Sequence, residues 1–299
     1  MNNVQEKALV RIILPAYNQG KYVTATIASL KKQTFQDFEV VLLDDGSNDG
    51  FTPKVLAELD YDKIIAKHLF TDNVGAAKRY NPFIKEAQNK YVLLLCGDDF
   101  IAPTFLEECV AFLEKQPEYA AVATDAYLFF QDTKKYQLFE YYEDLIGLPQ
   151  FLVDARYTGS CLMRKEALEQ FPLPELERKS DFNRWIYFLE NGWKLGVIKQ
   201  PLFYYRQLPS SQMATLTLEM DLAVKEQTYE LHRASFEKYA KDVYLYFVKT
   251  TWQKNLLYNN TEYLNDVLNS WSYKIGRFLT FPLRFLRDTI KNLLYKIKG

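Results

Sequence analysis

The sequence predicts an α/β protein in which a mainly parallel sheet is covered by helices on both faces. Over residues 1–130, short apolar runs of strand length alternate with stretches in which apolar residues recur at helical steps. The chain of 299 residues is 48% apolar and 25% charged, so it has enough apolar side chains to cover such a sheet. Sheets of this kind bind ligands beyond the carboxyl ends of their strands.

The expected strands are apolar runs too short for a buried helix. They are Leu9–Leu14, Phe38–Leu43, Lys63–Leu69, Tyr91–Leu95 and Ala120–Phe130. Helices are expected between them, because apolar residues there recur at three- and four-residue steps. They are a helix of about three turns with Tyr22, Ile27 and Leu30 on it, then Pro53–Leu59, Gly75–Gln88 and Pro103–Lys115. Pro82 is expected to bend or delimit the third of these helices.

The second half of the chain has a weaker pattern. Residues 131–209 contain a predicted helix at Ser180–Glu190 and a predicted strand near Lys194–Ile198. From residue 218 onward the pattern is helical, and we expect helices over roughly Leu218–Tyr258 and Glu262–Leu268. A C-terminal helical extension therefore follows the α/β part.

Charge and cysteine usage exclude several classes of protein. The chain has 37 Lys and Arg against 38 Asp and Glu, and Trp271–Gly299 holds seven cations and one anion. Residues 1–270 therefore carry a net charge of −7, which argues against a nucleic-acid-binding surface. Three Cys and two His are too few for a disulfide framework or a His/Cys zinc site. The N-terminus lacks an apolar signal region and no apolar run could span a bilayer, so we expect a cytoplasmic protein.

Two acidic pairs each end a predicted strand. Asp44 and Asp45 follow the second strand, and Asp98 and Asp99 follow the fourth. Taken alone, each pair also fits a turn that caps the next helix. Because the carboxyl ends of parallel strands share one edge, the two pairs together favour a nucleotide site that holds Mg²⁺ or Mn²⁺.

Other candidate residues fit structural roles as well as, or better than, functional ones when each is taken alone. Asp181 begins a helix, where it also fits a cap, and Gly159-Ser160 permits a close backbone approach to a substrate. Arg206 could bind phosphate, but its segment also fits an edge strand followed by a loop. We expect small core side chains at Cys96 and Cys161 and structural roles for His68 and His232.

A set of these motifs, in the same order, resembles the family 2 glycosyltransferases. The set spans about residues 8–212 and comprises Val10–Asn18, Ser29-Leu30, Gln33-Thr34, Phe38–Ser47, Asn73-Val74-Gly75, Asn81, Tyr91–Asp99, Gly159-Ser160, Asp181, Gly192 and Leu202–Arg206. The resemblance implies a GT-A fold, in which a Rossmann-like nucleotide-binding half is fused to an acceptor-binding half. We therefore expect a GT-A domain at 1–217, with nucleotide-sugar binding at about 8–130 and acceptor binding at about 131–217. The C-terminal helical region is 218–299.

The resemblance assigns the nucleobase pocket to the ends of the first two strands. Pro15 and Tyr17 match residues that line this pocket. Asp45 matches the carboxylate that reads the uracil edge, with Asp44 beside it. The donor is therefore expected to be a UDP-sugar.

The resemblance assigns the reaction chemistry to three further carboxylates. Asp98 and Asp99 match the residues that hold the metal and the diphosphate, so Asp98 also belongs to the nucleotide-binding set. Asp181 matches the catalytic base, although Ser180 replaces the usual Glu before it. Contacts to the acceptor or to phosphate are predicted for Gly159, Ser160, Trp185 and Arg206.

Three further positions depart from the family pattern. The family's Arg aligns with Tyr80, so Lys78 or Arg79 is expected to take its place in nucleotide binding. The family often has Asp where Cys96 stands, which leaves the metal to Asp98 and Asp99 alone. Leu208 occupies a place where a metal-binding His is common.

The function that the resemblance implies is the inverting transfer of one sugar to an acceptor hydroxyl in glycan or polysaccharide biosynthesis. The enzyme would be a hexosyl- or N-acetylhexosaminyltransferase with Mn²⁺ or Mg²⁺ and a glycan, lipid-linked or protein acceptor. Nucleic acid is not an expected partner, and a homo-oligomer stays open. The alternative is a non-catalytic binding or scaffold protein on a decayed transferase fold.

The tail at 271–299 is basic and amphipathic. Apolar residues recur at three- and four-residue steps after Pro282, and they are Leu283, Leu286, Ile290, Leu293, Leu294 and Ile297. Two interpretations follow: a C-terminal helix docked on the core, or an interfacial helix that binds the anionic inner face of the cell membrane. The excess of cations over anions favours the second.

Overall fold

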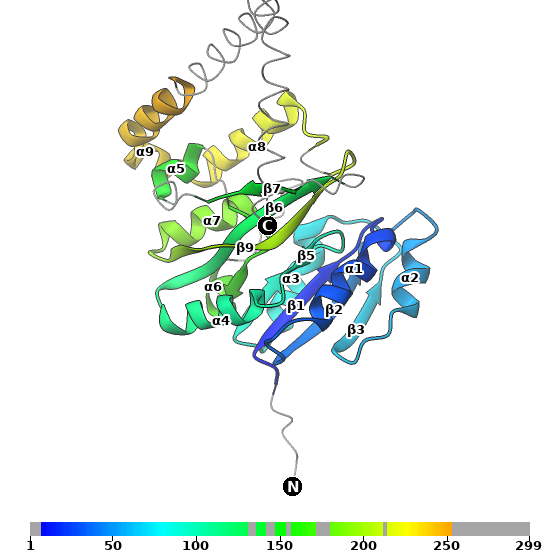
Figure 1. Ribbon diagram of the computed structural model, residues 1–299. Coiled ribbons are helices and arrows are strands. Elements are labelled where there is room, and N and C mark those ends of the chain that lie inside the picture. The colour runs from blue at the N-terminus through cyan, green and yellow to red at the C-terminus, as the bar shows by residue number, and fades with distance from the viewer. Residues whose placement is uncertain are drawn as a thin grey trace, which may run out of the picture. The chain divides into compact units, whose positions relative to one another are not determined.

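The structure is a computed structural model that describes residues 7–130, 136–141, 147–153, 157–171, 180–211 and 214–252. The chain divides into two compact units, Met1–Val243 and Tyr244–Gly299. In its described part the first unit contains a nine-stranded sheet with the order β3-β2-β1-β4-β8-β6-β9-β5, and β7 pairs with β6 (Figure 1). No helix among these residues is long and apolar enough to cross a membrane.

Four parallel strands form the first part of the sheet. They are β1 (Val10–Pro15), β2 (Phe38–Asp44), β3 (Ile64–Leu69) and β4 (Tyr91–Leu94). β1 pairs in parallel with both β2 and β4. Strands buried on both faces read as continuous apolar runs, which is why the sequence predicted β1, β2 and β4.

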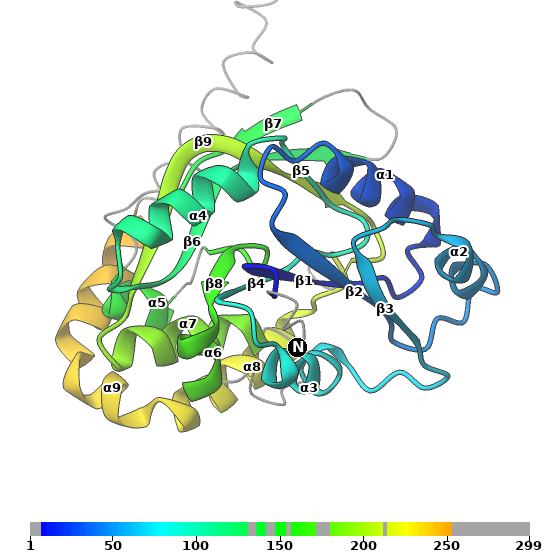
Figure 2. The ribbon, with the colours of Figure 1, turned by 90° about the horizontal axis from the view of Figure 1, so that it is seen from below.

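Helices cover both faces of these strands. They are α1 (Gly20–Lys31), α2 (Thr52–Glu58), α3 (Ala76–Glu86) and α4 (Phe105–Lys115). Figure 2 shows α1, α2 and α4 on one side of the sheet and α3 on the other. Pro82 lies inside α3 without ending it.

The rest of the sheet is mixed, which corrects the expectation of a mainly parallel sheet. Its strands are β5 (Phe100–Ile101), β6 (Tyr119–Phe130), β7 (Tyr136–Phe139), β8 (Leu162–Arg164) and β9 (Lys194–Gln207). β8 runs antiparallel to both β4 and β6, so it reverses the strand direction within the sheet. β9 is parallel to β6 and antiparallel to β5. The predicted strand near Lys194–Ile198 is longer than expected and continues to Gln207.

The remaining helices follow in chain order. They are α5 (Leu148–Val153), α6 (Lys165–Gln170), α7 (Ser180–Glu190), α8 (Leu218–Leu231) and α9 (Arg233–Lys238). The helical pattern predicted over roughly Leu218–Tyr258 is confirmed as far as residue 252, where the described residues end, with a break at His232. The buried ring of His232 lies 2.9 Å from a Glu190 oxygen and 3.1 Å from the Asn183 side-chain oxygen, so tertiary contacts override local helix preference.

The structure describes the end of the first unit but not the last part of the chain. The first unit extends to Val243 and so includes α8 and α9, beyond the boundary expected at 217. The predicted helix Glu262–Leu268 and the tail 271–299 lie outside the described residues.

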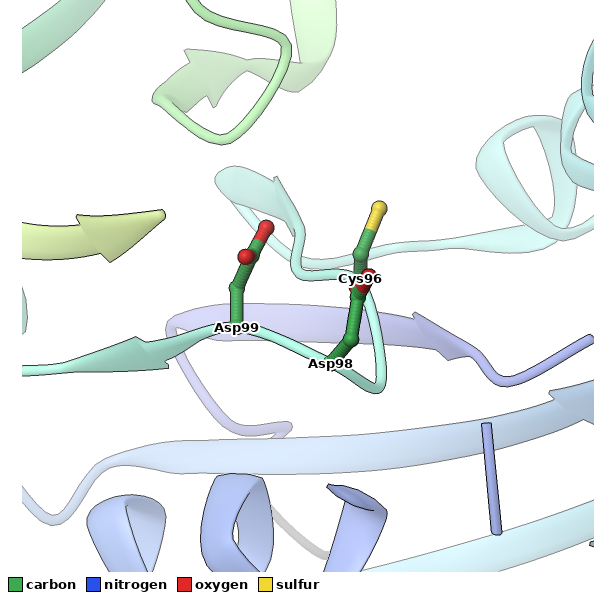
Figure 3. A group of neighbouring side chains, drawn as sticks. All are labelled: Cys96, Asp98 and Asp99. Carbon is green, nitrogen blue, oxygen red and sulfur yellow. The ribbon is translucent and has the colours of Figure 1, made fainter. Parts of the chain in front are cut away.

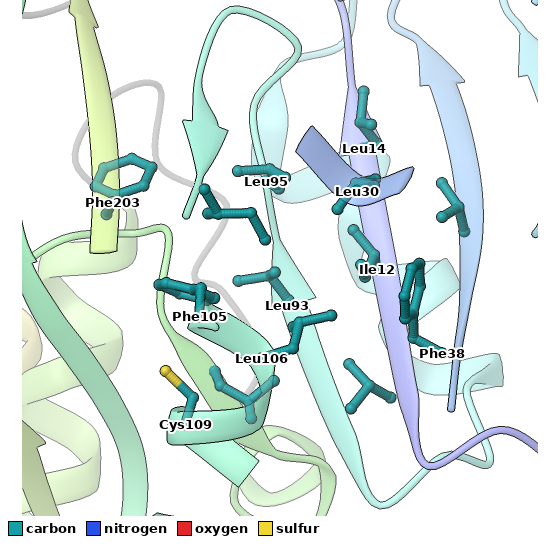
Figure 4. Close-up of a cluster of buried hydrophobic side chains, with 14 of the residues drawn as sticks. Ile12, Leu14, Leu30, Phe38, Leu93, Leu95, Phe105, Leu106, Cys109 and Phe203 are labelled. Carbon is teal, nitrogen blue, oxygen red and sulfur yellow. The ribbon is translucent and has the colours of Figure 1, made fainter. Parts of the chain in front are cut away.

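The core consists of two hydrophobic clusters on opposite faces of the sheet. Alternate residues of each inner strand point to opposite clusters, as Ile12 and Ile13 do on β1. One cluster packs α1 and α4 against the strands (Figure 4). The other contains residues of α3, α5, α6 and α7. Burial on both faces leaves the carboxyl edge of the strands as the place where polar groups gather.

Candidate functional site

The first acidic pair closes β2 and is bound mainly by the protein itself. Asp44 is fully buried, and one of its oxygens accepts hydrogen bonds from the Ser47 backbone N–H (2.9 Å) and hydroxyl (2.5 Å). Its other oxygen, Oδ2, is buried with no partner among the described residues. That oxygen is therefore the acceptor of this residue that a ligand could use.

Asp45 is engaged by three donors. It accepts hydrogen bonds from the backbone N–H groups of Val74 (3.3 Å) and Gly75 (3.0 Å). It also forms an ion pair with Arg79, 2.5 Å from Nε to Oδ1, in which both side chains are under 10% exposed. Asp45 thus anchors the segment that leads into α3, and its role in reading a base stays a prediction.

The residues predicted around the nucleobase pocket are brought to the same edge. Tyr17 is 39% exposed, and the carbonyl of Pro15 accepts a hydrogen bond from Gly97 N–H at 2.7 Å. Of the two cations considered, Arg79 is committed to Asp45 and stacks on Phe70, whereas Lys78 is exposed.

Tyr80 links the two acidic pairs electrostatically. Burial raises the pKa of its hydroxyl well above the ordinary value, and the charges of Cys96, Asp45 and Asp98 raise it further. Tyr80 therefore lies near members of both pairs, which follow strands that end at the same edge of the sheet.

The second acidic pair follows β4 and forms a cluster with a cysteine (Figure 3). One ligand atom from each of Cys96, Asp98 and Asp99 lies within 4.8 Å of the other two. Asp98 is 8% and Asp99 2% exposed. Burial raises the pKa of Asp98 to about 6 and the pKa of Asp99 well above its ordinary value, and Asp98 raises the latter further. Two adjacent carboxylates that resist ionisation in the absence of a metal ion are suited to binding a cation.

The loop that carries this cluster is held from two sides. The Thr26 hydroxyl of α1 contacts the carbonyls of Gly97 (2.9 Å) and Asp99 (2.6 Å). Arg206 of β9 donates its backbone N–H to Asp99 Oδ1 and its Nε–H to the Asp98 carbonyl, both at 2.8 Å. Through these two hydrogen bonds Arg206, which was predicted to bind phosphate, positions the acidic loop in this structure. Its guanidinium also lies 4.5 Å from the ring centre of Tyr22.

Asp181 lies in the first turn of α7, close enough to Cys96 to act on it electrostatically. A Cβ added to Gly159 would lie 3.1 Å from Asp181 Oδ2, so the glycine lets the backbone approach this carboxylate closely. Burial is the main cause that raises the pKa of the Cys96 thiol, and the charges of Asp98, Asp99 and Asp181 raise it further. The structure thus brings together the predicted base and the acidic pair that the sequence singled out.

Two residues with predicted substrate contacts are engaged within the protein. Trp185 is 1% exposed and packs in the hydrophobic cluster beneath α7, and its contact with an acceptor stays a prediction. Ser160 is 6% exposed, and its backbone N–H donates to the Thr158 hydroxyl at 3.1 Å.

Sequence reasoning missed three residues of the site. Cys96 was expected in the core, but it is half-buried beside Asp98 and Asp99; its place two residues before Asp98 was the available signal. Burial raises the pKa of Tyr205, with further contributions from Asp99, Cys96 and Asp181, so it lies near these groups. Arg184 is fully buried near Asp181, and burial lowers its pKa to about 10.

Comparisons with known proteins identify related sequences. The sequence model described as Glycosyl transferase family 2 matches residues 11–171. TuaG of Bacillus subtilis (strain 168), described as a teichuronic acid biosynthesis glycosyltransferase, is 25% identical over 258 residues, which cover 82% of this chain and 93% of TuaG. TarS of Staphylococcus aureus (strain MW2), a poly(ribitol-phosphate) beta-N-acetylglucosaminyltransferase, is 34% identical over 106 residues, or 35% of this chain and 18% of TarS.

Solved structures show the same arrangement of strands and helices. Crystalline S. aureus TarS 1-349 in complex with UDP-GlcNAc has a TM-score of 0.57 and 21% identity, covering 72% of this chain and 66% of that one. The mannosyltransferase PcManGT from Pyrobaculum calidifontis, in complex with GDP-Man and Mn²⁺, has a TM-score of 0.54 and 17% identity, covering 97% and 88%. At these identities the likeness establishes the fold.

Proposed function

The chain belongs to glycosyl transferase family 2 and has the GT-A fold, and from this premise we propose that it is an inverting, metal-assisted glycosyltransferase. It moves one sugar from a UDP-sugar to an acceptor hydroxyl in glycan or polysaccharide biosynthesis. The TarS structure holds UDP-GlcNAc, which supports a uridine nucleotide and a hexose or N-acetylhexosamine as donor. The relation to TuaG supports a polysaccharide or its precursor as acceptor.

The observation that carries this proposal is that Asp181 and the second acidic pair act on the same two side chains. Cys96 and Tyr205 each feel the charges of Asp98, Asp99 and Asp181. A base on one side and cation-binding carboxylates on the other are the two groups that a direct displacement at a sugar carbon needs.

The donor set of Cys96, Asp98 and Asp99 fits a divalent cation such as Mn²⁺, because all three atoms can approach one ion. A bound cation there supplies charge that stabilises the departing diphosphate. Asp181 orients the acceptor hydroxyl and accepts its proton as the hydroxyl oxygen bonds to the anomeric carbon. The bond from that carbon to the diphosphate oxygen breaks on the opposite face, so an α-linked donor gives a β-linked product.

The test of the base is Asp181→Asn, assayed by release of UDP from a panel of UDP-sugars with Mn²⁺. The amide keeps the shape of the side chain but cannot accept the proton, so kcat is expected to fall by roughly 10²–10⁴ with UDP binding unchanged. Glu166→Gln is the matched control, since Glu166 is an exposed acid in the first turn of α6, as Asp181 is in α7. Wild-type kcat in the Asp181 variant would refute the assignment, and UDP binding without any turnover would favour the scaffold alternative.

We also propose that the tail 271–299 binds anionic membranes, an inference from its sequence alone. Each Lys or Arg near such a surface contributes about 1 kcal/mol. The full chain is expected to sediment with anionic but not neutral liposomes at low salt, and a chain ending at Ile275 is expected to stay in the supernatant. Full-length protein that stays in the supernatant with anionic liposomes contradicts the proposal.

A further inference from the structure

The acidic cluster after β4 contains a sulfur atom as well as carboxylate oxygens. Cys96 Sγ, Asp98 and Asp99 supply ligand atoms that lie within 4.8 Å of one another. In Figure 3 the sulfur of Cys96 and the carboxylate of Asp99 point to the same side of the loop. A metal–sulfur bond of about 2.3 Å and a metal–oxygen bond of about 2.1 Å let two ligands of one ion lie about 4.4 Å apart. Three ligands of one ion lie closer together, about 3.7 Å apart, so atoms within 4.8 Å of one another reach one ion by moving roughly half an ångström each.

Cys96 differs from the other two cysteines of the chain. Cys109 and Cys161 are 0% exposed and belong to the hydrophobic clusters, where they pack as small apolar side chains. Cys96 is half-buried and belongs to neither cluster. Its surroundings are the carboxylates of Asp98, Asp99 and Asp181, which are poor neighbours for an apolar group and good neighbours for a cation.

We propose that Cys96 is a ligand of the divalent cation and makes this site prefer first-row transition metals over Mg²⁺. Mg²⁺ takes oxygen ligands in near-ideal octahedral geometry, whereas thiolate favours softer ions. Among divalent ions the order Mn²⁺ < Co²⁺ < Zn²⁺ follows the general rise in affinity for sites with nitrogen and sulfur ligands. On binding, the thiol releases its proton to solvent as the metal–sulfur bond forms. The inference rests on the proposed function, because it deepens the metal role assigned there.

Cobalt is the probe that reports sulfur ligation directly. Titration of the full chain with Co²⁺ is expected to give a near-ultraviolet thiolate-to-cobalt charge-transfer band that saturates at one ion per chain. Cys96→Ser should abolish the band and weaken Co²⁺ binding by at least the roughly 10–100-fold that loss of a supporting partner costs a metal site. Cys109→Ala is the matched control, because it removes a thiol of α4 that belongs to a hydrophobic cluster. It should keep the band.

Selectivity provides a second measurement. By calorimetry with UDP present, wild-type protein is expected to bind Mn²⁺ at least roughly tenfold more tightly than Mg²⁺. Cys96→Asp, which supplies three carboxylates, should bring the two affinities together by raising that for Mg²⁺. A third measurement needs no variant: Co²⁺ should slow alkylation of Cys96 by iodoacetamide, and the same concentration of Mg²⁺ should not.

The outcomes separate this inference from the proposed function. A cobalt complex without the charge-transfer band, or a band that survives Cys96→Ser, overturns the role of Cys96. UDP-sugar turnover could continue in either case, so the glycosyltransferase proposal would stand. Conversely, a Cys96-dependent band in a protein that turns over no UDP-sugar with any cation would uphold the metal site and refute the enzymatic proposal.

Discussion

The two acidic pairs at the carboxyl edge of the parallel strands differ in what surrounds their carboxylates. Asp45 accepts hydrogen bonds from two backbone N–H groups and the guanidinium of Arg79. Asp99 accepts one from the backbone of Arg206, and burial raises the pKa of both Asp98 and Asp99. Asp45 of the first pair is neutralised by the protein, while the second pair carries a desolvation cost that a ligand can offset.

The difference shows how similar short motifs serve different ends. A buried carboxylate costs free energy unless it is paired, hydrogen-bonded or metal-bound. At Asp45 the protein supplies the partners, so the motif fixes a loop and the start of α3. At Asp98 and Asp99 much of the compensation is left to a ligand, so the motif is poised to bind one.

The largest effect is expected for Asp99→Asn, which tests whether the second acidic pair binds a cation. If Asp99 holds the cation against the diphosphate, turnover should fall by roughly 10²–10⁴, which corresponds to several kcal/mol of transition-state stabilisation. The melting temperature should be unchanged or higher, because the neutral amide removes the cost of a buried charge. Steady-state kinetics and calorimetry measure the two quantities. EDTA should reproduce the loss in wild-type protein and Mn²⁺ should reverse it; full activity in EDTA would contradict the metal role.

The opposite result is expected at the first pair. Asp45→Asn breaks a buried ion pair and leaves the Arg79 charge without its main partner, so the free energy of unfolding should fall by about 3 kcal/mol. Urea denaturation measures it. The matched control is Asp72→Asn, since Asp72 also contacts Arg79, at 3.2 Å, but is 66% exposed. That change should cost less than about 1 kcal/mol. An equal loss of unfolding free energy in the two variants would contradict the distinction between the buried Asp45–Arg79 ion pair and the exposed contact of Asp72 with Arg79.

The smallest expected effect is a pH dependence of stability in metal-free protein. The pKa of Asp98 is about 6 in the folded state against an ordinary 3.8, so the folded state binds more protons between these values. The free energy of unfolding contributed by Asp98 therefore falls as pH rises from about 4 to about 6. Urea titrations of wild type and Asp98→Asn in EDTA should differ by this slope.

Glu114 supplies a control of opposite sign for that measurement. Its hydrogen bond to Lys90 lowers its pKa, so its contribution is present above the ordinary pKa and is lost as pH falls. Glu114→Gln should therefore remove a contribution to the free energy of unfolding that rises with pH. The effect is expected to be small, because the Glu114–Lys90 pair is partly exposed. A pH slope that is unchanged in Asp98→Asn would contradict the assignment of this window to Asp98.

The sequence predicted the parts of the fold that local pattern determines. β1, β2 and β4 are continuous apolar runs, and α1 and α4 carry apolar residues at helical steps, so their positions were read to within a few residues. The reversal at β8 was not predicted, because a three-residue strand carries almost no pattern and its pairing is non-local. The break at His232 was missed for the same reason, since its partners lie more than 40 residues away on α7.

The sequence predicted which residues form the candidate site better than it predicted their contacts. Adjacent acids at strand ends indicated where Asp44, Asp45, Asp98 and Asp99 would gather. Nothing local indicated that the protein itself would pair Asp45, because Arg79 reaches it from 34 residues away. Cys96 was predicted as a core residue because a single cysteine after an apolar strand has the same pattern whether it packs or binds a ligand.

The buried ring of His232 has a consequence for recombination between relatives of this protein. It joins α8 and α9 to Glu190 and Asn183 on α7, the helix that begins beside Asp181. A chimera whose junction falls before α8 would inherit these partners from different parents and leave polar groups unmatched in the interior. A junction after Val243 keeps them together, so the C-terminal helices through that residue are inherited as part of the catalytic unit.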